Sequence, residues 1–152
     1  MMNEKDKIKE VIKNHNLMCV STVDEKGMPK ARSVDYAMGE NESILYFITN
    51  KATDKVKEIK NNNNVFVVID HDCDSMEELQ QLRYIKATGK AYISETPEET
   101  QKAFKYILQK FPYLKDLPGD PSDFVGVRVE LDKVTLTDNT VQFGYMEDVS
   151  YR

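Results

Sequence analysis

The sequence predicts a mainly β protein, an antiparallel β-barrel that carries a few helices on its outside. Short segments that alternate apolar with polar residues, or that are wholly apolar, recur along most of the chain, which is typical of strands. Turns of only a few residues separate most of these segments, which favours antiparallel neighbours. Only two or three segments have helical spacing. About seven strands therefore dominate, and a sheet that closes on itself buries them best.

The first part of the chain predicts one helix and three strands. Ile8, Val11 and Ile12 recur at helical spacing, so an amphipathic helix is expected over about residues 4–14. The turns that follow are short, and one of them has Gly27 where a positive φ is wanted. Such short connections predict a three-stranded antiparallel meander. Its strands are expected over residues 17–23, 29–37 and 44–49.

The middle of the chain predicts a short helix followed by two strands. The helix is expected over residues 53–60, and the four asparagines at 61–64 form the turn that ends it. Residues 65–69 are wholly apolar, which predicts a central strand that is buried on both faces. Residues 70–82 are acidic and predict an irregular segment. Residues 84–93 alternate cleanly and predict another strand.

The strongest local signal lies at Thr96, Pro97 and Glu99. These residues predict an N-cap, a proline in the first helical position and a capping box. Apolar residues follow at helical spacing as far as Phe111, and Pro112 ends the helix. The remaining strands are expected over residues 124–131, 133–137 and 140–145.

Length and composition limit the possible classes of protein. A chain of 152 residues with 40% hydrophobic residues is expected to form a single domain, residues 1–152, with a real core. No apolar run approaches the length of a membrane span, and the polar start does not resemble a secretory signal. Two cysteines do not make a disulfide framework, so a cytoplasmic setting is expected. The net charge of −5 argues against nucleic-acid binding but allows a small anionic ligand.

Polar side chains gather where the third strand meets the short helix, namely Thr49, Asn50, Thr53 and Lys55. Thr53 is the predicted N-cap, and its hydroxyl is expected to accept a hydrogen bond from an amide of the first turn. A helix start offers free N–H groups and a partial positive charge, both of which favour a phosphate or a carboxylate. Lys55 adds a full charge. The segment predicts a small-anion site, and an ordinary capped helix with solvated lysines is the alternative.

The order of these motifs resembles a known family. The segment Met18–Val34, the segment Leu45–Asn50, the helix with Lys55 and the strand at Val65 follow one another as in the FMN-binding split-barrel superfamily, the pyridoxamine 5′-phosphate oxidase-like group. The resemblance covers about residues 5–93 in register and the later strands more loosely. Length and layout are similar to the short branch with general stress and nitroimidazole-resistance proteins. The resemblance implies an antiparallel split β-barrel that binds FMN.

The resemblance also implies site residues. An arginine on the second strand, a threonine at the end of the third, and Ser/Thr plus Lys at the helix start hold the flavin and its phosphate in that family. Arg32, Thr49, Thr53 and Lys55 match these positions. The neighbouring residues at the implied cofactor site are Ser33, Val34, Ile48 and Asn50.

On the later strand, Tyr84 and Lys86 match positions where a partner subunit approaches the flavin ring, so a homodimer with flavin at its interface is implied. Two plainer interpretations stay open. Arg32 is then a strand arginine paired with an acidic neighbour, and Tyr84 and Lys86 are ordinary exposed strand residues.

The chain also departs from the true oxidases of the family. Those are longer and carry an Arg and a His near the C-terminus that grip pyridoxal phosphate. This chain has no histidine beyond His71, and Asp54 stands where many relatives have an additional arginine. Oxidation of vitamin B6 is therefore not expected. The expected function is that of an FMN flavoprotein that passes electrons from a nicotinamide or another reductant to a small acceptor, with no catalytic residue singled out.

Three other interpretations remain open. One is a flavin-binding stress protein without turnover. Another is a haem-binding or haem-degrading relative that uses His15 or His71. The third is the deazaflavin F420 in place of FMN, because a phosphate site does not distinguish the rings.

The run Asp70-His71-Asp72-Cys73-Asp74 contains several types of metal ligand. Adjacent side chains of an extended segment point to opposite sides, so they do not converge, and no metal site is expected. Cys19 lies within an apolar strand and is expected to be a small core residue.

Overall fold

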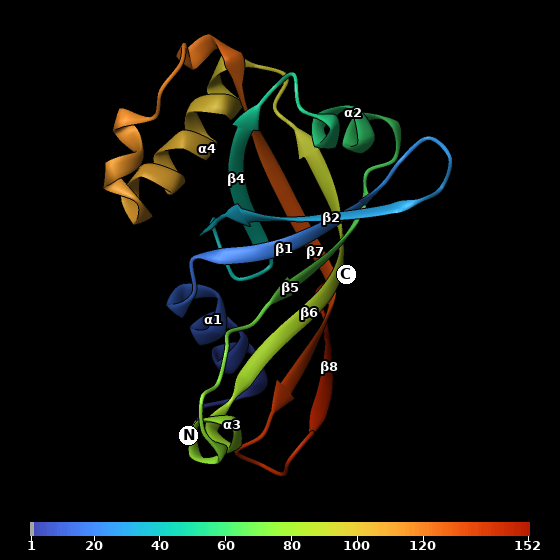
Figure 1. Ribbon diagram of the computed structural model, residues 1–152, viewed down its shortest axis with the longest axis vertical. Helices are drawn as coiled ribbons and strands as arrows, with labels where there is room; N and C mark the ends of the chain where they lie inside the picture. Colours follow the sequence, from blue (N-terminus) through green and yellow to red (C-terminus); the bar gives the residue numbers. More distant parts are fainter. Residues whose placement is uncertain (1) are drawn as a thin grey trace.

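The computed structural model describes residues 2–152, which form one curled antiparallel sheet with helices around it (Figure 1). The strands are β1 (Leu17–Val23), β2 (Pro29–Asp35), β3 (Ala37–Met38), β4 (Ile44–Asn50), β5 (Asn64–Ile69), β6 (Arg83–Ile93), β7 (Phe124–Asp138) and β8 (Met146–Ser150). The helices are α1 (Glu4–Asn14), α2 (Asp54–Asn61), α3 (Met76–Gln81) and α4 (Pro97–Lys110), with 3₁₀ turns at Pro112–Asp116 and Pro121–Asp123.

The strand order explains why the sheet curls. Neighbouring strands follow the order β2-β1-β5-β6-β7-β4-β3, and β8 pairs with the C-terminal half of β7. The strands β2 and β3 stand at opposite ends of this order, yet only Tyr36 separates them in the chain. The two edges must therefore meet, which bends the sheet into a barrel. The predicted mainly β barrel with peripheral helices is confirmed.

The inside of the curled sheet is filled by every second residue of the strands and by one face of α1. Ile8 and Ile12 of α1 are fully buried, and the hydroxyl of Tyr36 donates a hydrogen bond to the carbonyl of Ile12 at 2.6 Å. Outside the barrel, α4 packs on β4 and β7. A Cβ at Gly126 of β7 would collide with the Cβ of Ala103, so this close approach requires glycine.

Two predictions about the strands were wrong, one on pairing and one on strand boundaries. The third predicted strand, β4, does not extend a meander next to β2 but pairs with β7 from Ile44 to Asn50. The segments 124–131 and 133–137 form the single strand β7. Opposite Thr88 and Gly89 its register shifts, and Asp132 is the additional residue of this bulge. The polar Asp132 thus bends the strand without ending it.

Other differences are local. The stretch 65–69 is buried on one face only, because Phe66 points outward with 39% of its surface exposed. Residues 140–145 form a turn, and the last strand is β8. The acidic stretch 70–82 contains α3, whose first turn is capped by Ser75. Thr96 caps α4 as predicted.

The capping box at α4 is wrong in one detail. The carboxylate of Glu99 accepts a hydrogen bond from the amide of Glu95, one residue before the expected donor Thr96. The proline of the first helical turn is where the sequence places it.

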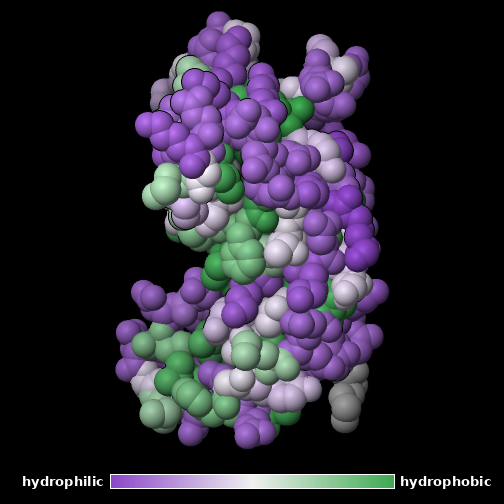
Figure 2. Space-filling view, turned by 90° about the vertical axis from the view of Figure 1, so that its right-hand side faces the viewer, coloured by the Kyte–Doolittle hydropathy of each residue, from purple (hydrophilic) through white to green (hydrophobic). Residues whose placement is uncertain are grey.

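Large apolar side chains are exposed at one end of the molecule. Figure 2 shows hydrophobic surface gathered in its lower part, where Figure 1 has the turn between β7 and β8, while the upper part is mostly hydrophilic. Val141, Phe143, Tyr145 and Met146 of this turn keep between 36% and 65% of their surface exposed. Grouped apolar side chains of this kind are typical of a contact surface. Among residues 2–152, no helix is long and apolar enough to cross a bilayer.

Candidate functional site

The structure brings Lys55, Thr49 and Thr53 together where β4 passes into α2. The ammonium of Lys55 donates a hydrogen bond to the hydroxyl of Thr49 at 2.8 Å, and the Thr53 hydroxyl lies 3.5 Å from that of Thr49. Thr49 is the last inward-facing residue of β4, one alternation beyond the buried Phe47, and is 7% exposed. A hydroxyl-lined cationic corner therefore forms at the helix start.

The predicted capping role of the Thr53 side chain is wrong. Its hydroxyl donates to the carbonyl of Asn50 at 2.8 Å and makes no bond to the first turn of α2. The Asn50 side chain is also occupied, because it accepts the amide of Ala52 at 2.9 Å. The amide of Val56 donates to the Thr53 carbonyl at 3.2 Å, so the amides of Asp54 and Lys55 are those of the first turn that remain for a ligand.

Arg32 reaches the same region from the neighbouring strand. It lies on the inner face of β2, opposite Val20, and donates to the hydroxyl of Thr22 at 2.7 Å. Its Nη2 forms an ion pair with Glu58 of α2 at 3.0 Å. The alternative that Arg32 pairs with an acidic neighbour is thus what the structure shows. The side chain nevertheless keeps 22% of its surface exposed.

The charges of the cluster act on one another. Burial lowers the pKa of Lys55, and the nearby Arg32 guanidinium lowers it further, while Asp54 and Glu58 oppose the shift. Two cations therefore stand close together beside two hydroxyls and a helix start. A bound phosphate relieves this repulsion and matches the donors present. The arrangement is chemically suited to an anion.

Of the other predicted cofactor residues, some lie near the cationic corner and others point away from it. Val34 shares the inner face of β2 with Arg32 and packs against the core, whereas Ser33 points to the opposite, exposed face. Ile48 points away from Thr49 and packs against the cluster under α4. Asn50 stays at the corner and is exposed. The side chains of Ser33 and Ile48 are thus not part of the cationic corner.

Tyr84 lies far from this corner in the same chain. It pairs with Thr137 near the end of β7, whereas Thr49 pairs with Val125 near its start. These two positions on β7 are twelve residues apart, about 40 Å of strand. Tyr84, and Lys86 beside it on the same outer face, can approach a ligand at Lys55 only from a second copy of the chain.

Sequence analysis missed Glu58, Thr22 and Lys30. Glu58 is only 7% exposed, accepts the hydroxyl of Thr22 at 2.8 Å and pairs with Lys30 at 3.2 Å as well as with Arg32. A signal was present, because Thr22 continues the buried alternation of Met18 and Val20. Burial alone would raise the pKa of Glu58, but the hydrogen bonds and the cations lower it. Glu58 is therefore an ionised, buried carboxylate.

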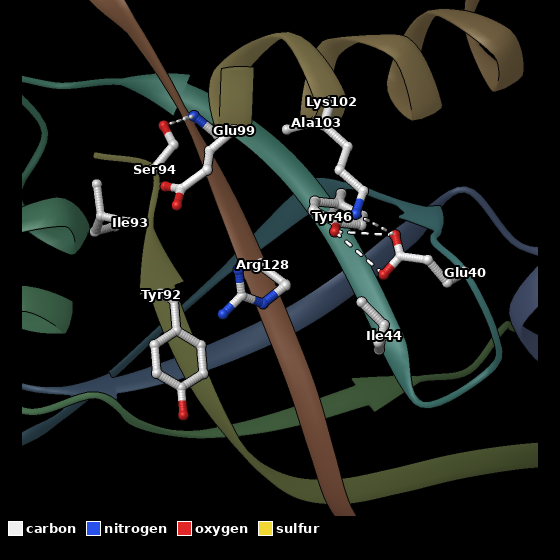
Figure 3. A pocket seen from close by; sticks show the side chains of 11 residues that line it. Glu40, Ile44, Tyr46, Tyr92, Ile93, Ser94, Glu99, Lys102, Ala103 and Arg128 are labelled. Carbon is white, nitrogen blue, oxygen red and sulfur yellow. Dashed lines mark hydrogen bonds and ion pairs between the residues drawn. The ribbon is translucent and has the colours of Figure 1, made fainter. Parts of the chain in front are cut away.

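Three cavities lie nearby. One of about 610 Å³ opens beside α2 and is lined by Lys30, Asp54 and Glu58 among others. A groove of about 1100 Å³ runs between the β1–β2 turn and the end of β6. The third, of about 270 Å³, lies under α4 (Figure 3). Its two cations are paired within the protein, Lys102 with Glu40 and Arg128 with Glu130, whereas Glu99 of its lining accepts the amide of Glu95. The cavity therefore offers an anion no unpaired cation among residues 2–152.

The two histidines of the chain meet in space. The rings of His15 and His71 stack with centroids 4.8 Å apart. His15 contacts the Val11 carbonyl through Nδ1 at 2.7 Å, and its Nε2 lies 2.9 Å from Nδ1 of His71. A carbonyl only accepts, so in the neutral pair His15 Nδ1 donates to it and His71 Nδ1 donates to His15. The Nε2 lone pair of His71 then has no hydrogen-bond partner among residues 2–152.

The acidic loop around His71 does not become a metal centre. Among residues 2–152, no group of three or more His, Cys, Asp or Glu side chains is arranged to hold a metal ion. Cys19 and Cys73 are free thiols, and both are half-buried. The prediction of Cys19 as a core residue was wrong, because Met18 and Val20 take the inner face of β1 and turn Cys19 outward.

The chain is similar to proteins of known families. The family model described as pyridoxamine 5′-phosphate oxidase matches residues 4–138. General stress protein 26 of Bacillus subtilis (strain 168) is 30% identical over 121 residues, which are 78% of this chain and 81% of that protein.

Solved structures agree with this match. A heme binding protein from Mycobacterium smegmatis superposes with a TM-score of 0.79 at 15% identity, covering 99% of this chain, and the chain spans only 59% of that protein. General Stress Protein 26 from Bacillus anthracis gives 0.68 at 22% identity, with 98% and 99% covered. A 5-nitroimidazole antibiotic resistance protein from Bacteroides thetaiotaomicron gives 0.70 at 20% identity, with 89% and 84% covered. At such identities these structures support the fold alone.

Proposed function

The chain belongs to the pyridoxamine 5′-phosphate oxidase family, whose model matches residues 4–138 of its 152, and from this premise we propose that it is an FMN-binding flavoprotein. The FMN phosphate binds at the start of α2 to Thr49, Thr53 and Lys55, with Arg32 beside them. Electrons pass from a nicotinamide or another reductant to a small acceptor. The proposal agrees with the resemblance seen in the sequence, which the family match confirms.

One observation carries this proposal, namely that Lys55 is held at a helix start by a hydroxyl and faces a second cation. Its ammonium has Thr49 as its hydrogen-bond partner and no carboxylate within ion-pair distance among residues 2–152. Burial and Arg32 both disfavour its charged form, as the lowered pKa records. If the role of Lys55 were only structural, a neighbouring carboxylate would stabilise its charged form. A ligand phosphate supplies that missing charge.

The proposal includes a homodimer in which the flavin lies between two copies. Support comes from the distance between Lys55 and Tyr84, which one chain cannot close, and from exposed apolar side chains on the outer strand faces. Leu17 of β1 and Phe66 of β5 keep 55% and 39% of their surfaces exposed. The flavin supplies the redox chemistry. The chain anchors the phosphate, orients the ring and excludes water.

The absorption spectrum of the purified protein tests the cofactor. Flavin bands in the near ultraviolet and blue are expected, as is saturable FMN binding that an Arg32→Ala, Lys55→Ala double variant loses. Equal FMN affinity of wild type and double variant would exclude the proposed site. Bleaching of the bands by NADH or NADPH supports an oxidoreductase. A spectrum that never bleaches points to a flavin-binding stress protein without turnover.

A haem-binding function is the second candidate, and a specific atom favours it. Nε2 of His71 is exposed and holds a lone pair, because its Nδ1 is engaged with His15. One structural neighbour is a heme binding protein. A Soret band on haem titration that disappears in His71→Ala supports this function. The same band in wild type and variant excludes His71 as the ligand.

A further inference from the structure

Glu58 forms ion pairs with two cations that border the proposed phosphate site. Its carboxylate lies 3.0 Å from Nη2 of Arg32 and 3.2 Å from the ammonium of Lys30. The hydroxyl of Thr22 donates to the same carboxylate at 2.8 Å and itself accepts from Arg32. Glu58 is thus a buried acceptor with a full set of partners, placed inside α2 one turn after Lys55.

This geometry changes the charge that a ligand meets. Without Glu58, Lys30, Arg32 and Lys55 would present three positive charges around the start of α2. With it, the guanidinium of Arg32 is already neutralised by a carboxylate at hydrogen-bond distance. Lys55 is different, because its partner is the neutral hydroxyl of Thr49. An incoming phosphate therefore meets one cation that has no carboxylate partner, Lys55, and has to share Lys30 and Arg32 with Glu58.

We propose that Glu58 is a specificity-determining positioning residue, which fixes Arg32 through the Thr22–Glu58 contacts and reduces the attraction of the site for phosphate. This inference rests on the proposed phosphate site at α2. Glu58 does not touch the ligand. It acts through Arg32, holding the guanidinium toward β1 and setting how strongly a phosphorylated flavin is preferred over a flavin without phosphate.

The test is a pair of flavin titrations on Glu58→Gln, which keeps an oxygen for Thr22 and removes the charge. FMN should bind about tenfold more tightly than to wild type, because Arg32 loses its ion pair with the Glu58 carboxylate and its charge becomes available to the phosphate. Riboflavin, which lacks the phosphate, should bind unchanged. Glu98→Gln is the matched control. It makes the same change of net charge in the first turn of α4, where Glu98 is exposed and has no ion pair among residues 2–152, and should alter neither affinity.

A double-variant cycle separates action through Arg32 from a general effect of charge. In an Arg32→Gln background, Glu58→Gln should no longer tighten FMN binding. The inference is overturned if the tenfold gain persists without Arg32, or if Glu58→Gln weakens FMN and riboflavin alike, as a merely structural role would.

Inorganic phosphate provides a readout that does not depend on flavin. Phosphate should raise the melting temperature of Glu58→Gln more than that of wild type and of Glu98→Gln. If phosphate does so while FMN fails to bind, the flavin proposal fails and the role of Glu58 stands. If FMN binds wild type and Glu58→Gln equally, the flavin proposal stands and the role of Glu58 fails. Equal phosphate shifts in all three proteins also overturn it.

Discussion

Lys55 and Thr49 face each other across the turn between β4 and α2, and the ammonium donates to the hydroxyl at 2.8 Å. The contact joins the last inward residue of a strand to the first turn of a helix. It fixes a cation beside the helix start without neutralising it. Each feature alone is common in proteins. Their combination next to Arg32 is what makes an anion site here physically reasonable.

The first prediction concerns pH. Burial and Arg32 lower the pKa of Lys55 in the free protein, and a bound phosphate favours the charged ammonium, so the pKa is higher in the complex. Between the two values, binding takes up a proton. FMN affinity should therefore fall as pH rises through the lowered pKa of Lys55, at a pH below the ordinary value of about 10.4. Titrations at several pH values should show this fall in wild type but not in Lys55→Met. An identical fall in both proteins contradicts the assignment.

The second prediction uses the separation of Lys55 and Tyr84. If each flavin lies between Lys55 of one copy and Tyr84 of the other, then a mixed dimer of Lys55→Ala and Tyr84→Ala chains has one intact site and one doubly damaged site. Co-expressed and purified with two different tags, it should bind FMN at half the wild-type stoichiometry with wild-type affinity. Each variant alone should bind weakly at both sites. Mixed dimers that bind no better than the single variants would contradict a shared site.

The third prediction concerns stability far from the site. Asp138 is 1% exposed and is held by Lys7 at 2.7 Å and by Arg83 at 3.2 Å. Although burial alone would raise it, these partners and Thr140 lower the pKa of Asp138 to about 2. Asp138→Asn should reduce the free energy of unfolding by about 2 kcal/mol, because it removes the buried carboxylate that Lys7 and Arg83, both only partly exposed, share. Urea denaturation measures this loss. Asp148, which forms an exposed ion pair with Lys133, offers the control, because Asp148→Asn should change the free energy of unfolding very little.

The carboxylate of Asp138 also predicts how the stability of the fold depends on pH in the acid range. Its pKa is lower in the folded than in the unfolded chain, where about 3.9 is expected. The stabilisation is therefore complete above the unfolded value and is lost as pH falls toward about 2. Wild type should lose stability over this range, and Asp138→Asn should lose less. Parallel acid curves for the two proteins would contradict the role of Asp138.

The fourth prediction concerns the packing of α4. A Cβ at Gly126 collides with that of Ala103, so Gly126→Ala should lower the free energy of unfolding by about 1–3 kcal/mol. Adding Ala103→Gly removes the clash. The double variant should be more stable than the sum of the two single changes predicts, as denaturant titration can measure. Strict additivity would show that the two residues do not meet.

Much of the fold follows from local pattern. The capping threonine, proline and apolar spacing of α4 and the alternation of β6 act over a few residues, so sequence alone locates them. Pairing partners are different. The chain passes from β2 through Tyr36 and β3 to β4, which pairs with β3 on one side and with β7 on the other, so β2 and β4 are not neighbours in the sheet. No local pattern contains that pairing.

The candidate site divides in the same way. Thr49, Thr53 and Lys55 lie close in sequence, so their meeting follows from one strand-to-helix turn. The role of Glu58 was not predicted, because it depends on contacts with Thr22 and Arg32. These two residues belong to the β1–β2 hairpin, which folds against α2. The hydrogen bond from the Thr53 hydroxyl to the Asn50 carbonyl was likewise not predictable from N-cap preference.

The most direct test of the central claim is the preference of the protein for FMN over riboflavin, measured for wild type and Lys55→Ala by the same fluorescence titration. The two ligands differ only in the phosphate. We expect wild type to prefer FMN by about a hundredfold, equivalent to about 2.7 kcal/mol, and Lys55→Ala to lose most of that preference while its riboflavin affinity is unchanged. A wild type that binds both ligands equally, or a variant that keeps the full preference, would contradict the assignment of the start of α2 as the phosphate site.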